Sequence, residues 1–446
     1  MGAVSLAWKL RRADRVSDAK TARPAASIRL RSRIALLAYD GALAVSNILL
    51  NLLARLLFWR NPKIPGNRTM VLRAGTIGDI LVAVPALRLL REQSRASRIT
   101  LLNWTKDDAG SQTSSNTACK LVTHRELCDE VITFNAADLW NRRRRQRLKS
   151  LIRACRPDRV LLLPFSGETL WSLCKKALLF RLLGIEVRPE GFHIVSIPSL
   201  FTRSQLAARR IVHQAIAAAI PVAGPHATVD ESGFRLPQNL RAAASLAKTL
   251  ERTGVPEGSA VLMVGVSAKY AHKRWPVACF ASVILKIRDE FCVFPVIVGG
   301  AEDFELGRQL QEMLGGAAAN LCGRLNLDES VELARMAVAF LGNDSGAAHL
   351  AAAGGARTFT IFSAIHPPGL WEPAGGQGKT YRARVKCEYC RSETRCVNGS
   401  LACVMGVDPR PVIADLRNLL ATCVKPSASA NCKADEPVAS LGRPTA

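Results

Sequence analysis

Short apolar runs alternate along most of the chain with longer segments whose apolar residues recur every three to four positions. The runs predict buried strands, and the longer segments predict helices packed on them. The predicted strands are residues 69–73, 99–103, 130–134, 159–163, 260–266, 294–298, 338–341 and 358–362. The predicted helices include 80–92, 203–220, 276–289, 302–314, 327–337 and a small-residue helix ending at 353. Regular alternation favours an α/β fold of two doubly wound parallel-sheet domains that face each other across a cleft.

The alternation stops between residues 221 and 237, which makes this segment the natural domain boundary. We therefore expect one domain at residues 65–235 and a second at 236–425. Residues 106–117 are rich in Asp, Ser, Thr and Asn and predict a loop over the cleft. Residues 426–446 combine Ser, Ala and Pro with charge, which is typical of a disordered tail.

The pattern before residue 65 is different. Residues 1–33 hold nine Lys and Arg against two Asp and predict a loose basic arm. Residues 34–60 are strongly apolar, and their polar positions Asp40, Asn47 and Asn51 are followed by Arg55 at spacings of seven, four and four. On a helix these four side chains line one narrow stripe.

Such an amphipathic helix is expected to lie in the interface of an anionic membrane, with the basic arm on the lipid headgroups. The length of the apolar stretch also allows a spanning helix, and a helix packed into the protein core is the third alternative. No small-residue cleavage site follows the stretch, which argues against a removed signal peptide.

A glycine-rich turn, Ala-Gly-Thr-Ile-Gly-Asp at residues 74–79, joins the first predicted strand to its helix. This arrangement is typical of nucleotide-binding α/β folds, although the spacing is not the dinucleotide fingerprint. Asp79 stands at the carboxyl end of the strand, where open α/β sheets bind ligands. It is alternatively a helix cap, which stabilises by about 1 kcal/mol. Pro85 predicts a bend in the first turn of the helix.

A second turn, residues 342–349, reads Gly-Asn-Asp-Ser-Gly-Ala-Ala-His and also leads from a strand into a helix. The N-terminus of such a helix is a binding place for phosphate. Asp344 or Ser345 can cap the helix; because a carboxylate repels phosphate, Asp344 either caps or takes a sugar hydroxyl. His349 lies one turn beyond Ser345 on the same face, where it either reaches the ligand or packs.

Basic residues outnumber acidic ones by 61 to 36, which gives a net charge of +25. The resulting field attracts nucleic acid, anionic membranes or phosphorylated substrates. An aromatic content of 6% without basic–aromatic interleaving argues against nucleic acid. Four basic residues follow the strand 260–266, namely Lys269, His272, Lys273 and Arg274. Cations at a strand end can meet phosphate, but such charges are also common on solvated loops.

The 13 cysteines are mostly scattered singly, as in proteins of reducing compartments. Four of them cluster near the end of the chain, at Cys387, Cys390, Cys396 and Cys403. These thiols can bind structural zinc or form a redox-sensitive disulfide, although the second pair lacks the two-residue spacing of a zinc knuckle. We expect no catalytic role for them.

Four segments together resemble the ADP-heptose:lipopolysaccharide heptosyltransferases, glycosyltransferase family 9: residues 70–88, Lys273-Arg-Trp-Pro276, Gly299-Gly-Ala-Glu302 and 342–352. The resemblance spans about residues 65–422 and implies a GT-B fold of two Rossmann-like domains. Its N-terminal domain would take the acceptor and its C-terminal domain a nucleotide-sugar. The chain departs from the pattern at residues 365–367, where many relatives carry Thr-Asp-Pro and this chain reads Ile-His-Pro.

The resemblance also implies roles for single residues. Asp79 matches the family's glycine–aspartate motif and would be the base that removes the acceptor hydroxyl proton. The implied donor-binding residues are Ser267, Lys273, Glu302, Asp344, Ser345, Gly346 and His349. Among them, Lys273 would hold phosphate and Glu302 the nucleoside hydroxyls, while Asp344 would be a ligand-orienting cap. The acceptor is assigned to Gly78, Arg73 and Arg88.

The implied activity is inverting, metal-independent transfer of a heptose or related sugar from a nucleotide-sugar, with ADP-heptose expected, to an anionic lipopolysaccharide core. No cofactor is expected. The alternatives are the same fold with another nucleotide-sugar or a protein acceptor, and a non-catalytic nucleotide-sugar-binding membrane scaffold. The expected partners are the donor, an anionic glycolipid and an anionic membrane surface, but not nucleic acid. The expected location is the cytoplasm, peripherally on the inner membrane.

Overall fold

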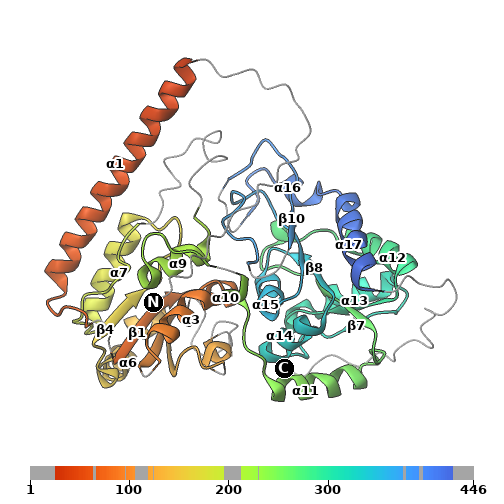
Figure 1. Cartoon of the computed structure of the whole chain (residues 1–446), viewed down its shortest axis with the longest axis horizontal. Helices are drawn as coiled ribbons and strands as arrows, with labels where there is room; N and C mark the ends of the chain where they lie inside the picture. Colours follow the sequence, from red (N-terminus) through yellow and green to blue (C-terminus); the bar gives the residue numbers. More distant parts are fainter. Residues whose placement is uncertain are drawn as a thin grey trace, which may run out of the picture.

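The computed structural model describes residues 26–63, 67–95, 97–105, 119–123, 125–194, 212–229, 231–374, 378–390 and 395–424. Most of the predicted basic arm, the predicted loop 106–117 and the predicted tail 426–446 lie outside these ranges. Two α/β units lie side by side, and a long helix, α1 (Ala26–Leu57), runs along the outer edge of the N-terminal unit (Figure 1).

Four parallel strands form the N-terminal sheet in the order β3-β2-β1-β4. They are β1 (Arg68–Ala74), β2 (Arg98–Trp104), β3 (Glu130–Phe134) and β4 (Arg159–Leu162). The central strands β1 and β2 each contain five consecutive buried residues, as expected when helices cover both faces of a parallel sheet. The four strands predicted for this half are confirmed.

Successive side chains of β1 enter two different cores because strand residues alternate between the faces of a sheet. Met70 and Leu72 pack with α1, α6 (Arg142–Cys155) and α7 (Leu170–Leu182). Val71 packs on the other face with α3 (Val84–Gln93) and α9 (Gln214–Ala223).

Six parallel strands form the C-terminal sheet in the order β10-β9-β8-β5-β6-β7. They are β5 (Ala260–Gly265), β6 (Val293–Ile297), β7 (Ala319–Asn320), β8 (Ala339–Asn343), β9 (Thr358–Ile361) and β10 (Lys379–Tyr381). The helices around it include α11 (Leu240–Arg252), α12 (Val277–Glu290), α13 (Phe304–Met313), α14 (Leu327–Met336), α15 (Gly346–Gly354) and α17 (Pro409–Cys423). The predicted architecture of two parallel α/β units is therefore confirmed.

Three predicted helices have different bounds. The helix predicted at 80–92 is two helices, α2 (Ile77–Leu81) and α3, because Pro85 lacks the N–H that a helix interior needs and fits the first turn of a new helix. Within the predicted helix 203–220, α9 begins only at Gln214, and residues 203–211 lie outside the described ranges. The helix predicted at 34–60 begins earlier, at Ala26.

One face of α1 packs on the protein. Leu50, Ala54 and Phe58 are buried in the core that includes α7. The Asn47 side chain donates to the carbonyl of Ile194 at 3.1 Å and accepts from its N–H at 2.6 Å. Asn47, part of the predicted polar stripe, therefore faces the protein. Within the described ranges, no helix combines the length and hydropathy needed to cross a membrane.

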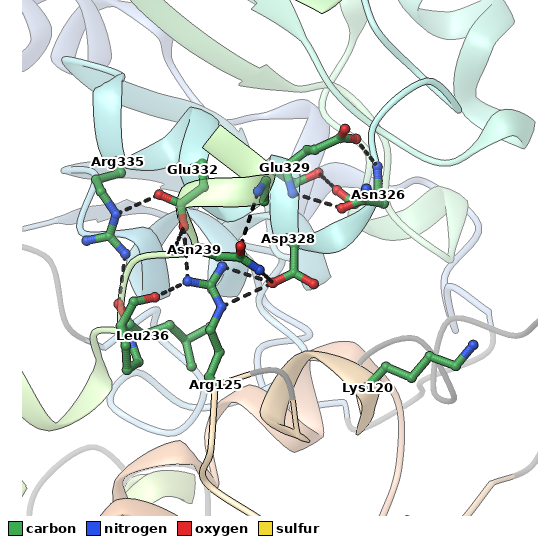
Figure 2. Close-up of polar contacts among 12 residues, drawn as sticks. Lys120, Arg125, Leu236, Asn239, Asn326, Asp328, Glu329, Glu332 and Arg335 are labelled. Atoms are coloured by element: carbon green, nitrogen blue, oxygen red, sulfur yellow. Dashed lines mark hydrogen bonds and ion pairs between the residues drawn. The ribbon is translucent and has the colours of Figure 1, made fainter. Parts of the chain in front are cut away.

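A buried guanidinium joins the two units. Arg125 comes from the N-terminal unit, and its Nε donates to Asp328 Oδ1 at 3.1 Å while its Nη1 donates to Glu332 Oε1 at 3.0 Å (Figure 2). Both carboxylates belong to α14. The guanidinium also donates to the carbonyl of Pro237 in the segment that connects the units. The N–H of Asn239 donates to Glu332 at 2.9 Å, so the connecting segment is held by the same cluster.

Apolar packing continues across this junction. Leu87 of α3 shares one core with Val331 of α14 and with Ala353 of α15. The carbonyl of Ala353 also accepts from the N–H of Leu236 at 2.8 Å. The two units are thus held by a common core and not only by a covalent link.

Replacing Arg125 by Met removes the guanidinium that Asp328 and the buried Glu332 share, while Arg335 stays paired with Glu332 at 3.0 Å. We expect Arg125→Met to lower the free energy of unfolding by about 3–5 kcal/mol, because the side chains of Arg125 and Glu332 are 1% and 2% exposed. Arg98→Met is the matched control, since Arg98 and its partner Glu130 are 64% and 36% exposed and such pairs contribute about 0–1 kcal/mol. Urea unfolding followed by circular dichroism measures both. Equal losses of unfolding free energy in the two variants would contradict the stabilising role of the Arg125 cluster.

Candidate active site

The turn after β1 positions Asp79. Gly75 has a φ of +132°, and a Cβ on it would lie 2.3 Å from the Asp79 side chain, so only glycine fits there. Thr76 donates to Asp79 Oδ2 through its N–H at 2.7 Å and its hydroxyl at 3.0 Å. Thr76 is therefore the N-cap of α2 and Asp79 the third residue of a capping box, and not the N-cap that was the alternative prediction. Asp79 Oδ1 takes no part in these two bonds.

The buried Arg73 side chain supports this turn through a hydrogen bond to its backbone. Its Nε donates to the carbonyl of Asp79 at 3.1 Å, and its guanidinium lies 3.7 Å from the ring centre of Phe165. Burial lowers the pKa of Arg73 to about 10, against the opposing effect of Asp79 and Glu168, so the group stays charged at pH 7. The Arg73 side chain is 2% exposed, so it is not accessible to an acceptor, and the predicted acceptor role of Arg73 is wrong.

The other two residues assigned to the acceptor are also in structural contacts. The Arg88 side chain donates to the carbonyl of Arg235 in the connecting segment. Gly78 is buried in α2, where it faces the C-terminal unit. Gly78 is next to Asp79 but buried, and Arg88 is engaged with the connecting segment, so neither forms an open surface for an acceptor here.

The predicted donor residues gather at one edge of the C-terminal sheet. Ser267 and Lys273 follow β5, Glu302 follows β6, and Asp344 and Ser345 follow β8. The order β8-β5-β6 makes these strands neighbours, and because all are parallel their carboxyl ends lie at the same edge. Polar residues that are far apart in the sequence thus share one edge of the sheet, the edge at which open α/β sheets bind ligands.

Lys273 and Asp344 form an ion pair at this edge. Lys273 Nζ donates to Asp344 Oδ2 at 2.7 Å, with 18% and 9% of the side chains exposed. Asn343, fully buried, accepts from the N–H of Trp275 at 3.0 Å and donates to the carbonyl of Val266 at 2.8 Å. These bonds tie the basic loop to the end of β8 and fix the position of the lysine.

Of the two predicted caps, Asp344 is wrong, because the residue at the N-cap of α15 is Ser345 and the Asp344 carboxylate accepts from Lys273. Ser345 stands at the N-cap of α15 instead and makes no side-chain cap bond. Its hydroxyl is buried and has no hydrogen-bond partner. A buried hydroxyl left unpaired costs about 1–3 kcal/mol, and the first N–H groups of α15 point the same way along the helix axis. This helix start can therefore bind an anion.

The two units touch where α2 meets α15. A Cβ on Gly78 would lie 3.0 Å from His349 Cδ2, and a Cβ on Gly346 would lie 3.3 Å from Ile77 Cβ. The two glycines thus allow a close approach that larger residues would block. This contact brings Asp79 of the N-terminal unit into electrostatic range of His349.

His349 is a neutral imidazole at this contact. Burial lowers its pKa to about 4, and the nearby carboxylate of Asp344 opposes the shift without cancelling it. At pH 7 the ring therefore acts as a hydrogen-bonding group and not as a cation.

Glu302 lies at the far end of the row from Asp344, with β5 between their strands. It is exposed, and its Oε2 would lie 2.4 Å from a Cβ on Gly300, so the carboxylate folds over the glycine backbone. Its exposure leaves the carboxylate accessible to a ligand.

Two aromatic groups of the site were missed from the sequence. The Trp371 ring meets His349 edge-on at 6.4 Å between ring centres and lies 6.4 Å from Phe165 of the other unit. A ring nitrogen of His213 lies 2.9 Å from the carbonyl oxygen of Glu372. Neither residue belongs to a recognisable motif. The only indication of the site in the sequence was the presence of an aromatic residue, Trp371, in the loop that follows β9.

The four clustered cysteines are free thiols. Among the residues that the structure describes, no group of three or more His, Cys, Asp or Glu side chains is placed to hold a metal ion. The zinc hypothesis therefore gains no support from their arrangement. Cys292 departs from the expectation of isolated thiols, because it is in a disulfide.

Two Rossmann-like units in contact through α2 and α15 have the architecture of the GT-B class of glycosyltransferases. The sequence profile of glycosyltransferase family 9 (heptosyltransferase) matches residues 145–400, more than half of the chain. The chain belongs to glycosyltransferase family 9. No curated protein matches it in sequence.

Solved structures share this fold. The glycosyltransferase family 9 protein from Veillonella parvula aligns with a TM-score of 0.57 at 15% identity, over 82% of this chain and 98% of that one. The E. coli ADP-heptose LPS heptosyltransferase II aligns with a TM-score of 0.55 at 18% identity, over 80% and 99%. The E. coli heptosyltransferase WaaC with ADP aligns with a TM-score of 0.50 at 14% identity, over 79% and 99%.

The lowered pKa of His349 predicts a loss of stability in mild acid. An unfolded histidine takes up its proton near pH 6.5 and the folded one near pH 4, so the unfolded chain binds more protons between these values. Stability should therefore fall as the pH drops from about 6.5 to about 4, by roughly 3 kcal/mol in total. Between pH 7 and pH 5, His349→Gln should lose about 2 kcal/mol less than the parent chain in urea unfolding. Equal losses would contradict this assignment.

Proposed function

We propose that this protein transfers a heptose or related sugar from a nucleotide-sugar, with ADP-heptose as donor, to an anionic lipopolysaccharide core acceptor, with inversion and without a metal. The observation that carries the proposal is the meeting of the Asp79 turn with the anion-binding start of α15 across the α2–α15 contact. Family membership supports the transferase chemistry. The E. coli relatives, titled an ADP-heptose LPS heptosyltransferase and a heptosyltransferase with ADP, support this donor and acceptor.

The donor diphosphate would lie between Lys273 and the start of α15. The ammonium group has three donors, so it can hold Asp344 and a phosphate oxygen at the same time. The unpaired hydroxyl of Ser345 and the uncapped N–H groups would take further oxygens. Ser267 and Gly346 line the same edge, His349 would contact the sugar side, and Glu302 would accept from nucleoside hydroxyls. These groups stabilise the charge of the leaving diphosphate without a metal.

The acceptor hydroxyl would approach from the N-terminal unit. Asp79 Oδ1 takes its proton while the oxygen attacks C1 of the sugar, and the bond from C1 to the diphosphate oxygen breaks with its electron pair leaving on the phosphate. Attack opposite the leaving group inverts C1. The cap bonds from Thr76 hold the other carboxylate oxygen and so fix the direction of Oδ1. Because the acceptor is a lipid, we place the reaction at the cytoplasmic face of the inner membrane.

Asp79→Asn tests the base. The amide retains a cap oxygen but cannot accept the proton, so the fold should persist while turnover with ADP-heptose falls at least ~100-fold. Transfer to a heptose-free lipopolysaccharide core measures turnover, and calorimetry with ADP should show unchanged affinity. Unchanged turnover in Asp79→Asn would show that Asp79 is not the base. A complete lack of transfer by the parent chain, together with tight nucleotide-sugar binding, would favour the scaffold alternative.

Lys273→Met tests the diphosphate site. Loss of a charge-assisted hydrogen bond should weaken ADP binding by at least ~10-fold. Lys286→Met is the control, because Lys286 lies on α12 with 54% of its side chain exposed and away from the site edge. Thermal-shift comparison of ADP, UDP, GDP and CDP on the parent chain then identifies the base. Equal affinities of the two variants for ADP would place the phosphates elsewhere.

A further inference from the structure

Helix α1 has a second apolar face, opposite the one that packs on the protein. Its side chains recur at intervals of three and four residues, as one helical stripe does. Each of them is at least half exposed: Val45, Ile48, Leu49, Leu52 and Leu56. We call this stripe the outer face. Leu56 is 84% exposed, whereas Leu50 on the inner face is fully buried.

Cations border the C-terminal end of the outer face. Arg55 and Arg60 are exposed, and Trp59 between them is 58% exposed. The guanidinium of Arg181, from α7, lies 4.0 Å from the centre of the Trp59 ring. Residues 41–57 contain no Asp or Glu. The acidic group paired with Arg60 is Glu186, at 3.9 Å.

The neighbouring helix α7 repeats the pattern. Trp171, Leu178 and Leu182 are 69%, 56% and 50% exposed and fall on one stripe with Lys175, whose Nζ lies 5.6 Å from the Trp171 ring centre. Helix α7 contains no acidic residue. Helix α6, which covers the same face of the sheet, begins with four arginines.

We propose that the outer face of α1 inserts into the headgroup region of an anionic membrane while the inner face stays packed on the N-terminal unit. Exposed leucines and isoleucine, a tryptophan at the border and surrounding cations are the features by which a helix lies in a lipid interface. A second copy of the chain fits less well, because its border would bring like charges together. The proposal rests on the proposed function only in that the acceptor is a membrane lipid.

This arrangement differs from a free amphipathic anchor. Because Asn47 and the buried leucine hold α1 to the domain, the membrane plane would be fixed relative to the N-terminal sheet and not joined to it by a flexible tether. Residues 1–33, with nine basic residues against two acidic ones, would add electrostatic attraction to the same surface.

Co-sedimentation of the full chain with vesicles tests the proposal. Vesicles of phosphatidylcholine mixed with phosphatidylglycerol should bind it, and vesicles of phosphatidylcholine alone should bind it far less. The double variant L52Q/L56Q should partition at least ~10-fold more weakly. The control L240Q/M313Q removes two residues that are 73% and 50% exposed on the C-terminal unit and should change the partition by less than about twofold.

The double variant R55Q/R60Q gives an independent test, since both side chains are exposed and their removal should not affect folding. It should weaken binding to the anionic vesicles by roughly 10-fold and reduce the salt dependence. Binding of either double variant equal to that of the parent chain would overturn the proposal. So would a loss of self-association in L52Q/L56Q, measured by sedimentation velocity, without any change in vesicle binding.

Failure of this proposal can be told apart from failure of the proposed function. ADP binding and heptose transfer to a detergent-dispersed acceptor should be unchanged in L52Q/L56Q, because α1 is remote from the donor edge. If those activities are absent in the parent chain while L52Q/L56Q still weakens vesicle binding, the outer face binds the membrane and the proposed enzymatic function is wrong.

Discussion

The buried Arg125 cluster is the interaction on which the site depends. A charged guanidinium at 1% exposure is tolerated only because two carboxylates of α14 and a carbonyl of the connecting segment surround it. Asp79 belongs to one sheet and Lys273 to the other, so any reaction that uses both requires a fixed relation between the sheets. The cluster, together with the core shared by α3, α14 and α15, provides that relation.

Helix α15 connects this junction to the chemistry. Its last turn carries Ala353, which packs in the shared core and accepts from the connecting segment, while its first residue follows the unpaired Ser345. A helix of nine residues thus has one end in the domain junction and the other at the proposed anion site. The contact of Gly78 with His349 sets how closely the Asp79 turn approaches it.

Much of the fold was predictable because buried parallel strands are apolar on both faces, which made the runs at 69–73 and 338–341 recognisable. The gathering of donor residues followed from the rule that parallel strands share a carboxyl edge. The pairing of Asp344 with Lys273 was not predictable, since it joins residues 71 positions apart. Likewise, the periodicity of α1 marked its apolar residues but could not show which of them the protein covers. The burial of Arg73 was hidden because a strand-end arginine looks the same in sequence whether it supports a turn or binds a substrate.

The Lys273–Asp344 pair has a consequence for selectivity. In a chain with a net charge of +25, an unpaired lysine at a helix start would attract anions with little selectivity. Here the ammonium is already compensated, so an isolated monoanion gains little by binding beside a carboxylate that repels it. A diphosphate carries enough charge and enough oxygens to use the lysine, the serine hydroxyl and the helix N–H groups together. At the proposed donor site, the ion pair would therefore favour diphosphate ligands over single phosphates.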